Sequence, residues 1–149
     1  MDCLRMNGRP GAGFGILAVL LLGFCGCGTA KYPVTGKIVF KDGTPLPGGL
    51  IVFSPVDPAN HTGARGYIDA DGTFTMSTDS EGDGSLAGRY KALIRGPTQG
   101  HGEDDPLSKV PMIDIKYYSF EKSGLEFDVK PGPNDFTITV DRNTKTKGR

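Results

Sequence analysis

One short stretch of the chain places acidic side chains at alternate positions. Asp79, Glu81 and Asp83 are separated by single residues and are followed by Gly84. Oxygen ligands at alternate positions of a glycine-containing loop are what a calcium ion takes from a helix–loop–helix site. The twelfth position of such a loop carries a bidentate glutamate, and here the twelfth residue from Asp79 is Tyr90. The pattern predicts a flexible acidic turn, with a weak calcium site at Asp79, Glu81 and Asp83 as the alternative.

The two histidines are the other candidates for metal or acid–base chemistry. His61 and His101 are 40 residues apart in polar stretches, and Glu103 and Asp104 follow the second of them. A catalytic zinc needs about three closely placed His or carboxylate ligands. An enzyme would need His101, Glu103 and Asp104 to converge with another carboxylate, whereas their setting is typical of a solvated loop. The sequence also has no Gly-x-Ser-x-Gly turn for a serine nucleophile, so we expect no catalytic residue and no cofactor.

The N-terminal segment has the order of an export signal. Arg5 and Arg9 precede an apolar run over residues 13–24. A run of ~12 residues suits a signal-peptide core and is shorter than the ~20 residues of a membrane-spanning helix. The run leads to Gly26-Cys27, which resembles the signal of bacterial lipoproteins, where a small residue precedes a cysteine that becomes lipidated. The resemblance implies a signal peptide over residues 1–26 and an extracytoplasmic protein anchored in a membrane by lipid on Cys27.

An ordinary secretory signal with an unmodified Cys27 is the alternative. The three cysteines stand at positions 3, 25 and 27. Cleavage before Cys27 therefore leaves a mature body with no disulfide and no cysteine zinc site. Residues 27–33 are expected to form a short lipidated tether in front of the folded part.

The composition of the chain favours some classes of protein and argues against others. The chain has 149 residues, 17 basic and 17 acidic side chains, and 37% hydrophobic residues, which suits one globular domain. Because a nucleic-acid binder shows a basic excess, the formal net charge of zero argues against a nucleic-acid partner. The 23 glycines and 11 prolines favour many short strands joined by turns over a helical protein.

Seven short segments combine apolar alternation or apolar runs with turn residues at their ends. They cover residues 34–40, 50–54, 64–69, 73–77, 88–95, 125–129 and 136–140. This series predicts an all-β fold, a single seven-strand immunoglobulin-like β-sandwich over residues 34–140. The side chains expected to face inward are Val34, Ile38, Phe40, Ile51, Phe53, Ile68, Phe74, Leu93, Leu125, Phe127, Phe136 and Ile138.

Two further expectations concern the end of the chain and one tyrosine. Residues 141–149 are rich in basic and polar side chains and are expected to be a disordered basic tail. Tyr90 follows a glycine at the start of a late strand. We expect its hydroxyl to turn back onto the preceding loop backbone, as in a tyrosine corner.

Several motifs follow one another in an order known from one family. They are Val34-Thr35-Gly36-Lys37-Ile38, Asp42-Gly43-Thr44-Pro45-Leu46, Val52-Phe53-Ser54-Pro55, Asp69-Ala70-Asp71-Gly72-Thr73-Phe74 and Gly88-Arg89-Tyr90-Lys91. Together they resemble the carboxypeptidase-regulatory-like domain, a transthyretin-like β-sandwich common in bacterial surface lipoproteins. The resemblance covers residues 34 to about 95, with a similar closing segment over residues 116–136. It implies fold and location, because these domains contain no catalytic machinery and have no established general ligand.

The sequence thus predicts a non-enzymatic lipoprotein with a structural or protein-binding role in the cell envelope. The expected partners are a membrane, reached through the lipid anchor, and an envelope protein or polysaccharide. The alternative is a carbohydrate- or peptide-binding module that uses the loops after residues 55, 78 and 96 around an exposed tyrosine. The tyrosines available for that role are Tyr32, Tyr67, Tyr117 and Tyr118. If the adjacent Tyr117 and Tyr118 lie on a strand, they point to opposite faces.

Overall fold

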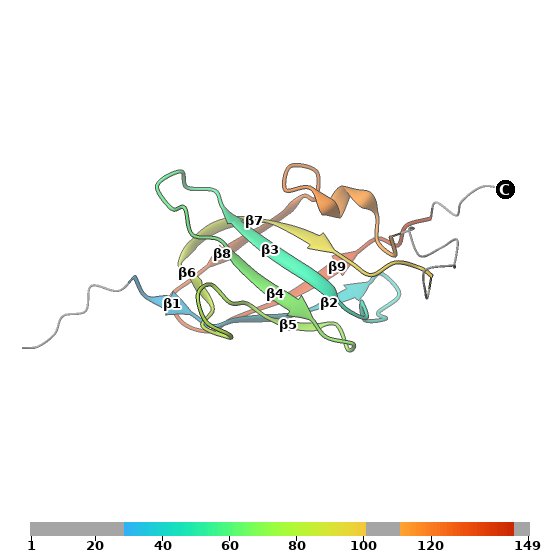
Figure 1. Cartoon of the computed structure of the whole chain (residues 1–149), viewed down its shortest axis with the longest axis horizontal. Coiled ribbons are helices and arrows are strands. Elements are labelled where there is room, and N and C mark those ends of the chain that lie inside the picture. The colour runs from blue at the N-terminus through green and yellow to red at the C-terminus, as the bar shows by residue number, and fades with distance from the viewer. Residues whose placement is uncertain (1–28, 101–110, 145–149) are drawn as a thin grey trace, which may run out of the picture.

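The strands of the fold follow the predicted order. A computed structural model describes residues 29–100 and 111–144. The elements are β1 (Lys31–Tyr32), β2 (Val34–Phe40), β3 (Gly49–Pro55), β4 (Ala64–Ile68), β5 (Thr73–Thr75), β6 (Ser85–Leu86), β7 (Gly88–Arg95), the 3-10 turn η1 (Ile115–Tyr118), β8 (Leu125–Val129) and β9 (Asn134–Val140). All seven predicted strands are present, and the all-β prediction is confirmed over the described residues (Figure 1). The sequence does not predict β1 and β6, because two residues carry no periodicity.

Seven of the strands are hydrogen-bonded into one sheet, in the order β8-β7-β3-β4-β5-β2-β9, and β1 pairs with β6 in a second, small sheet. The edge strands β8 and β9 follow one another in the chain with only residues 130–133 between them. A link this short spans at most about 18 Å, so the two edges lie close together and the sheet curls on itself. In Figure 1, β3 and β4 accordingly pass in front of β9. The pairing of β2 with β9 is parallel and runs from Val34–Asn134 to Phe40–Val140.

The core fills the inside of the curled sheet. The predicted inward residues on β2, β3, β4 and β5 are buried, as is Ile138 on β9. Leu125, Phe127 and Phe136 on the edge strands pack against this core but are only partly buried. Phe127 nevertheless stacks on Phe53, with ring centroids 5.2 Å apart, and contacts Phe136 at 4.9 Å.

One predicted core residue lies on the other face of the sheet. Ala92 and Ile94 of β7 join the core cluster; Leu93 does not, although its side chain is buried and only 8% exposed. Successive side chains of a strand point to opposite faces, so Leu93 must share the outer face with Arg95. The apolar run Ala92-Leu93-Ile94 hides this alternation in the sequence.

Tyr90 has the structural role that the sequence predicts. Its side chain is fully buried, and its hydroxyl donates a hydrogen bond of 3.1 Å to the carbonyl oxygen of Leu86. The Asn60 side-chain amide donates to the same hydroxyl at 3.3 Å. The ring stacks on Phe53, so Tyr90 ties two loops to the core.

The fold extends past the predicted boundaries at both ends. Lys31 and Tyr32, placed by the sequence in the 27–33 tether, form β1. Residues 141–144, placed in the disordered tail 141–149, are also part of the fold. Asp141 accepts hydrogen bonds from Lys116 and from the Tyr117 hydroxyl, the latter at 3.1 Å. These contacts depend on residues distant in sequence, so local composition does not reveal them. Residues 145–149 lie outside the described part.

The two adjacent tyrosines lie on η1 rather than on a strand. Tyr117 is buried and bonded to Asp141, and the Tyr118 hydroxyl donates to the carbonyl oxygen of Gly96 at 3.1 Å. Burial raises the pKa of the Tyr118 hydroxyl. Tyr117 is therefore part of the core, and Tyr118 packs against it while partly buried.

Candidate functional site

The acidic turn between β5 and β6 is built around the carboxylate of Asp83. Its Oδ1 accepts a hydrogen bond from the Thr78 backbone N–H at 2.6 Å, and its Oδ2 accepts from the N–H groups of Asp79 and Ser80 at 3.1 Å each. The Ser77 hydroxyl accepts from the Gly82 N–H at 2.9 Å. The backbone thus wraps around one anionic side chain. The sequence predicts a flexible turn, whereas the structure holds this turn together by hydrogen bonds.

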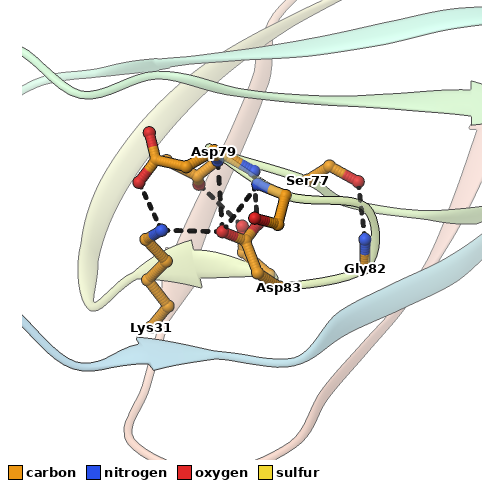
Figure 2. Close-up of polar contacts among 8 residues, drawn as sticks. Lys31, Ser77, Asp79, Gly82 and Asp83 are labelled. Atoms are coloured by element: carbon orange, nitrogen blue, oxygen red, sulfur yellow. Dashed lines mark hydrogen bonds and ion pairs between the residues drawn. The ribbon is translucent and has the colours of Figure 1, made fainter.

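Lys31 joins the turn to the start of the folded chain. Its ammonium group donates to Asp83 Oδ2 at 2.7 Å and forms a closer contact with Asp79 (Figure 2). Hydrogen bonds from Lys31 and from the turn backbone hold the pKa of Asp83 well below its usual range. The same two carboxylates raise the pKa of Lys31. We call Lys31, Asp79 and Asp83 the tether clamp.

The backbone reinforces the tether clamp. Lys31 is paired with Leu86, and Tyr32 with Ser85, through β1 and β6. Gly84 has a φ of +82°, and a Cβ atom there would lie 1.9 Å from the Tyr32 carbonyl oxygen. Glycine alone fits both this close approach and this left-handed conformation. Backbone pairing therefore fastens both residues of β1, and charge pairing adds to it at Lys31.

The three predicted calcium candidates are only partly brought together. Asp79 and Asp83 meet at Lys31, whereas Glu81 is exposed and lines the hollow next to the turn. Over residues 29–100 and 111–144, no group of three His, Cys, Asp or Glu side chains is arranged to hold a metal ion. An ammonium group takes the position between the two carboxylates that a cation would need.

A hollow of about 330 Å³ lies between the acidic turn and the outer face of β4. Arg65, Tyr67 and residues 77–81 line it. Tyr67 is 74% exposed, the highest value among the large apolar and aromatic side chains of the described residues. Of the three loops expected to surround an exposed tyrosine, the loop after residue 78 does so here.

Other predicted residues lie elsewhere or outside the described part. Cys27, the expected lipidation site, is outside it, as are His101, Glu103 and Asp104. His61 is exposed in the loop after β3 and lines a separate hollow with Thr29, Ala30, Tyr32 and residues 86–87.

Sequence reasoning missed Lys31, Arg65 and Arg95. Lys31 meets its partners 48 and 52 positions away, and nothing local indicates such a pairing. Arg65 and Arg95 lie on strands, where alternation places them on the outer face. That signal is readable in the sequence, but the neighbours of each arginine across the sheet are not.

Comparison with protein-family models, curated proteins and solved structures gives no match for this chain. The described residues contain no helix that has both the length and the apolar character needed to cross a bilayer. The candidate site therefore has to be interpreted from its own residues: a clamp beside the N-terminal segment and an aromatic hollow next to it.

Proposed function

We propose that this protein is a non-enzymatic extracytoplasmic lipoprotein, anchored to a membrane by lipid on Cys27, with a structural or protein-binding role in the cell envelope. The observation that carries the proposal is the tether clamp, which fastens the chain at Lys31. Cys27 is four residues earlier, so an extended chain separates the two by at most about 14 Å. A lipid on Cys27 would thus hold the body against the membrane surface in a restricted orientation.

In this proposal the curled sheet is a two-layer, transthyretin-like β-sandwich of the carboxypeptidase-regulatory-like kind. The short link between the edge strands β8 and β9 supports it, because a two-layer arrangement needs the two edges of the sheet to lie close together. The buried hydroxyl contact of Tyr90 with Leu86 supports it as well, since the tyrosine corner recurs in sandwich folds.

A protein-binding role is supported by the two sheet edges. Among the described strands, β8 pairs with β7 alone and β9 pairs with β2 alone. Each therefore has one edge at which a partner's strand can add through backbone hydrogen bonds. This mode of binding needs no special side chains. It suits an envelope protein as partner and does not involve nucleic acid.

The anchoring claim is tested by intact mass of the protein extracted from the membranes of a bacterial host. We expect a wild-type mass equal to residues 27–149 plus diacylglycerol, with or without a further acyl chain. Cys27→Ala removes the lipid mass, whereas the matched variant Cys25→Ala keeps it. An unlipidated wild-type product cut at another position, or an uncut chain, would refute the anchor.

A binding module for carbohydrate or peptide is the second candidate function. The hollow beside the 74% exposed Tyr67 favours it, because clusters of an aromatic side chain with a few convergent polar groups are typical of ligand sites. Both functions are compatible with a lipid anchor, since the hollow uses none of the residues that precede the fold.

A further inference from the structure

The outer face of β4, β3 and β7 carries neighbouring aromatic, apolar and basic side chains. Arg65 and Tyr67 alternate with the buried residues of β4 and so point outward. Leu50 of β3 lies opposite Tyr67, and Arg95 of β7 lies opposite Leu50. Tyr67, Leu50 and Arg95 therefore form one row across three strands. Arg65 and Val52 begin the adjacent row.

Among the described residues, no carboxylate pairs with either arginine of this face. Within the described part of the chain, neither Arg65 nor Arg95 forms a hydrogen bond or an ion pair through its side chain. The other described arginines differ, because Arg89 pairs with Glu126 and Arg142 with Asp42. An unpaired guanidinium is planar, and two of its N–H groups can donate to the two oxygens of one carboxylate in a bidentate pair.

The hollow beside Tyr67 adds a polar rim. Its lining residues include the hydroxyl residues Ser77, Thr78 and Ser80 and the acidic residues Asp79 and Glu81. Asp79 is neutralised by Lys31, and the hydroxyls of Ser77 and Thr78 are each bonded within the turn. The rim is held in place beforehand, because Asp83 binds the backbone N–H groups of Thr78 and Ser80. A rim that is already ordered loses little entropy when a ligand binds. The volume of about 330 Å³ is at the lower end of the range for small-molecule sites.

We propose that this surface binds an anionic sugar polymer, with a sugar ring on Tyr67 and carboxylates on Arg65 and Arg95. The inference deepens the carbohydrate-binding alternative given above. An exposed aromatic face suits the apolar face of a sugar ring, and the hydroxyl-lined rim suits sugar hydroxyls. Tyr67 and Arg95 are two strand spacings apart, about 10 Å. A ligand of at least two linked units therefore reaches both.

An acidic peptide fits this surface less well. β4 is hydrogen-bonded to β3 on one side and to β5 on the other. Its backbone therefore has no free edge to which a peptide strand can add. A peptide would have to bind through side chains alone, whereas a sugar chain uses the ring face, the rim hydroxyls and the two cations together.

The test uses the full-length protein as processed by a bacterial host and purified in detergent. The probes are an oligogalacturonate, a neutral glucose oligosaccharide of equal length and a short poly-glutamate, with binding measured by calorimetry. We expect the oligogalacturonate to bind at least about tenfold more tightly than either control, with the preference falling as salt rises. Tyr67→Ala, Arg65→Gln and Arg95→Gln are each expected to weaken binding at least about fivefold.

Two variants sharpen the result. Ile115→Ala changes an exposed apolar side chain on η1 and is expected to leave binding unchanged. Glu81→Gln removes one of the two carboxylates of the rim, the other being Asp79, which Lys31 neutralises. It is expected to tighten binding of the anionic probe, because a like charge is removed.

The possible failures are distinguishable. Equal binding of the neutral oligosaccharide overturns the role of the arginines, and stronger binding of poly-glutamate assigns the face to an acidic peptide instead. No binding of the oligogalacturonate, or binding that survives Tyr67→Ala, overturns the proposal. None of these outcomes bears on lipidation, which is tested separately by the intact mass of the Cys27 variant.

Discussion

The ammonium group of Lys31 lies 2.7 Å from Oδ2 of Asp83, a residue 52 positions further along the chain. The same carboxylate accepts the backbone N–H groups of Thr78, Asp79 and Ser80. Asp83 thus organises its own turn and holds the first strand at the same time. The exit point of the N-terminal segment is therefore coupled to the shape of the rim beside Tyr67.

Replacing the central carboxylate tests this coupling. Asp83→Asn puts an N–H₂ group where backbone N–H groups and an ammonium now donate, so donors face donors. We expect the free energy of unfolding to fall by about 1–3 kcal/mol, the cost of unsatisfied hydrogen bonds to a charged group. Urea unfolding measures it. Glu81→Gln, an exposed change in the same turn, is the control and is expected to stay within about 0.5 kcal/mol. Equal effects of both variants would contradict the central role of Asp83.

Stability should fall in acid because several aspartates are more acidic in the folded chain. Hydrogen bonds from Thr44 and Arg142 lower the pKa of Asp42 to about 2, and the pKa of Asp83 and Asp141 is lowered by lysine partners. Between the unfolded pKa of 3.8 and these folded values, the unfolded chain binds more protons. Stability is therefore complete above pH ~4 and is lost as the pH falls through ~2.

Urea unfolding curves at about pH 6, 4, 3 and 2 measure this dependence. Asp83→Asn should give a shallower loss of stability below about pH 4 than the wild type, because one of the shifted carboxyls is absent. A wild-type stability that stays constant down to about pH 2 would contradict the depressed pKa values.

The fit of β1 against the turn depends on Gly84. Gly84→Ala places a Cβ 1.9 Å from the Tyr32 carbonyl oxygen, and we expect β1 to detach from β6. Gly43→Ala is a matched control, because Gly43 has a φ of +83° and no atom within 4 Å of a built Cβ. It bears only the backbone strain, about 1 kcal/mol. Limited proteolysis near residues 29–33 should be much faster in Gly84→Ala alone, and similar cleavage of both variants would refute the contact.

Two buried serines should respond to alanine in opposite directions. Ser85 Oγ is the buried side-chain polar atom in the described residues that has no hydrogen-bond partner. Ser123 Oγ donates to the Ala92 carbonyl oxygen at 2.6 Å and accepts from the Leu125 N–H at 3.2 Å. Ser85→Ala is expected to raise the free energy of unfolding by about 1 kcal/mol, whereas Ser123→Ala lowers it by about 1–2 kcal/mol. Thermal and urea unfolding measure both, and a loss in Ser85→Ala would reveal a partner for its hydroxyl.

Alternation and turn chemistry act over a few residues, and for this reason the sequence alone determined the seven strands and most of the core. Val34, Ile38 and Phe40 follow the period of two and are buried. The corner formed by Tyr90 was also predictable, because its hydroxyl reaches a carbonyl only four residues earlier. Leu93 is buried as predicted but faces outward, because a continuous apolar run does not say which of its members faces inward.

The tertiary structure decided how distant segments meet. The parallel pairing of β2 with β9 joins residues 100 positions apart, and Lys31 is aligned with Asp83 by the pairing of β1 with β6. The row of Tyr67, Leu50 and Arg95, with Arg65 two residues from Tyr67 on β4, likewise depends on the order β4-β3-β7. A local pattern carries no register between strands, so the tether clamp and the row of Tyr67, Leu50 and Arg95 arise only when the strands pair.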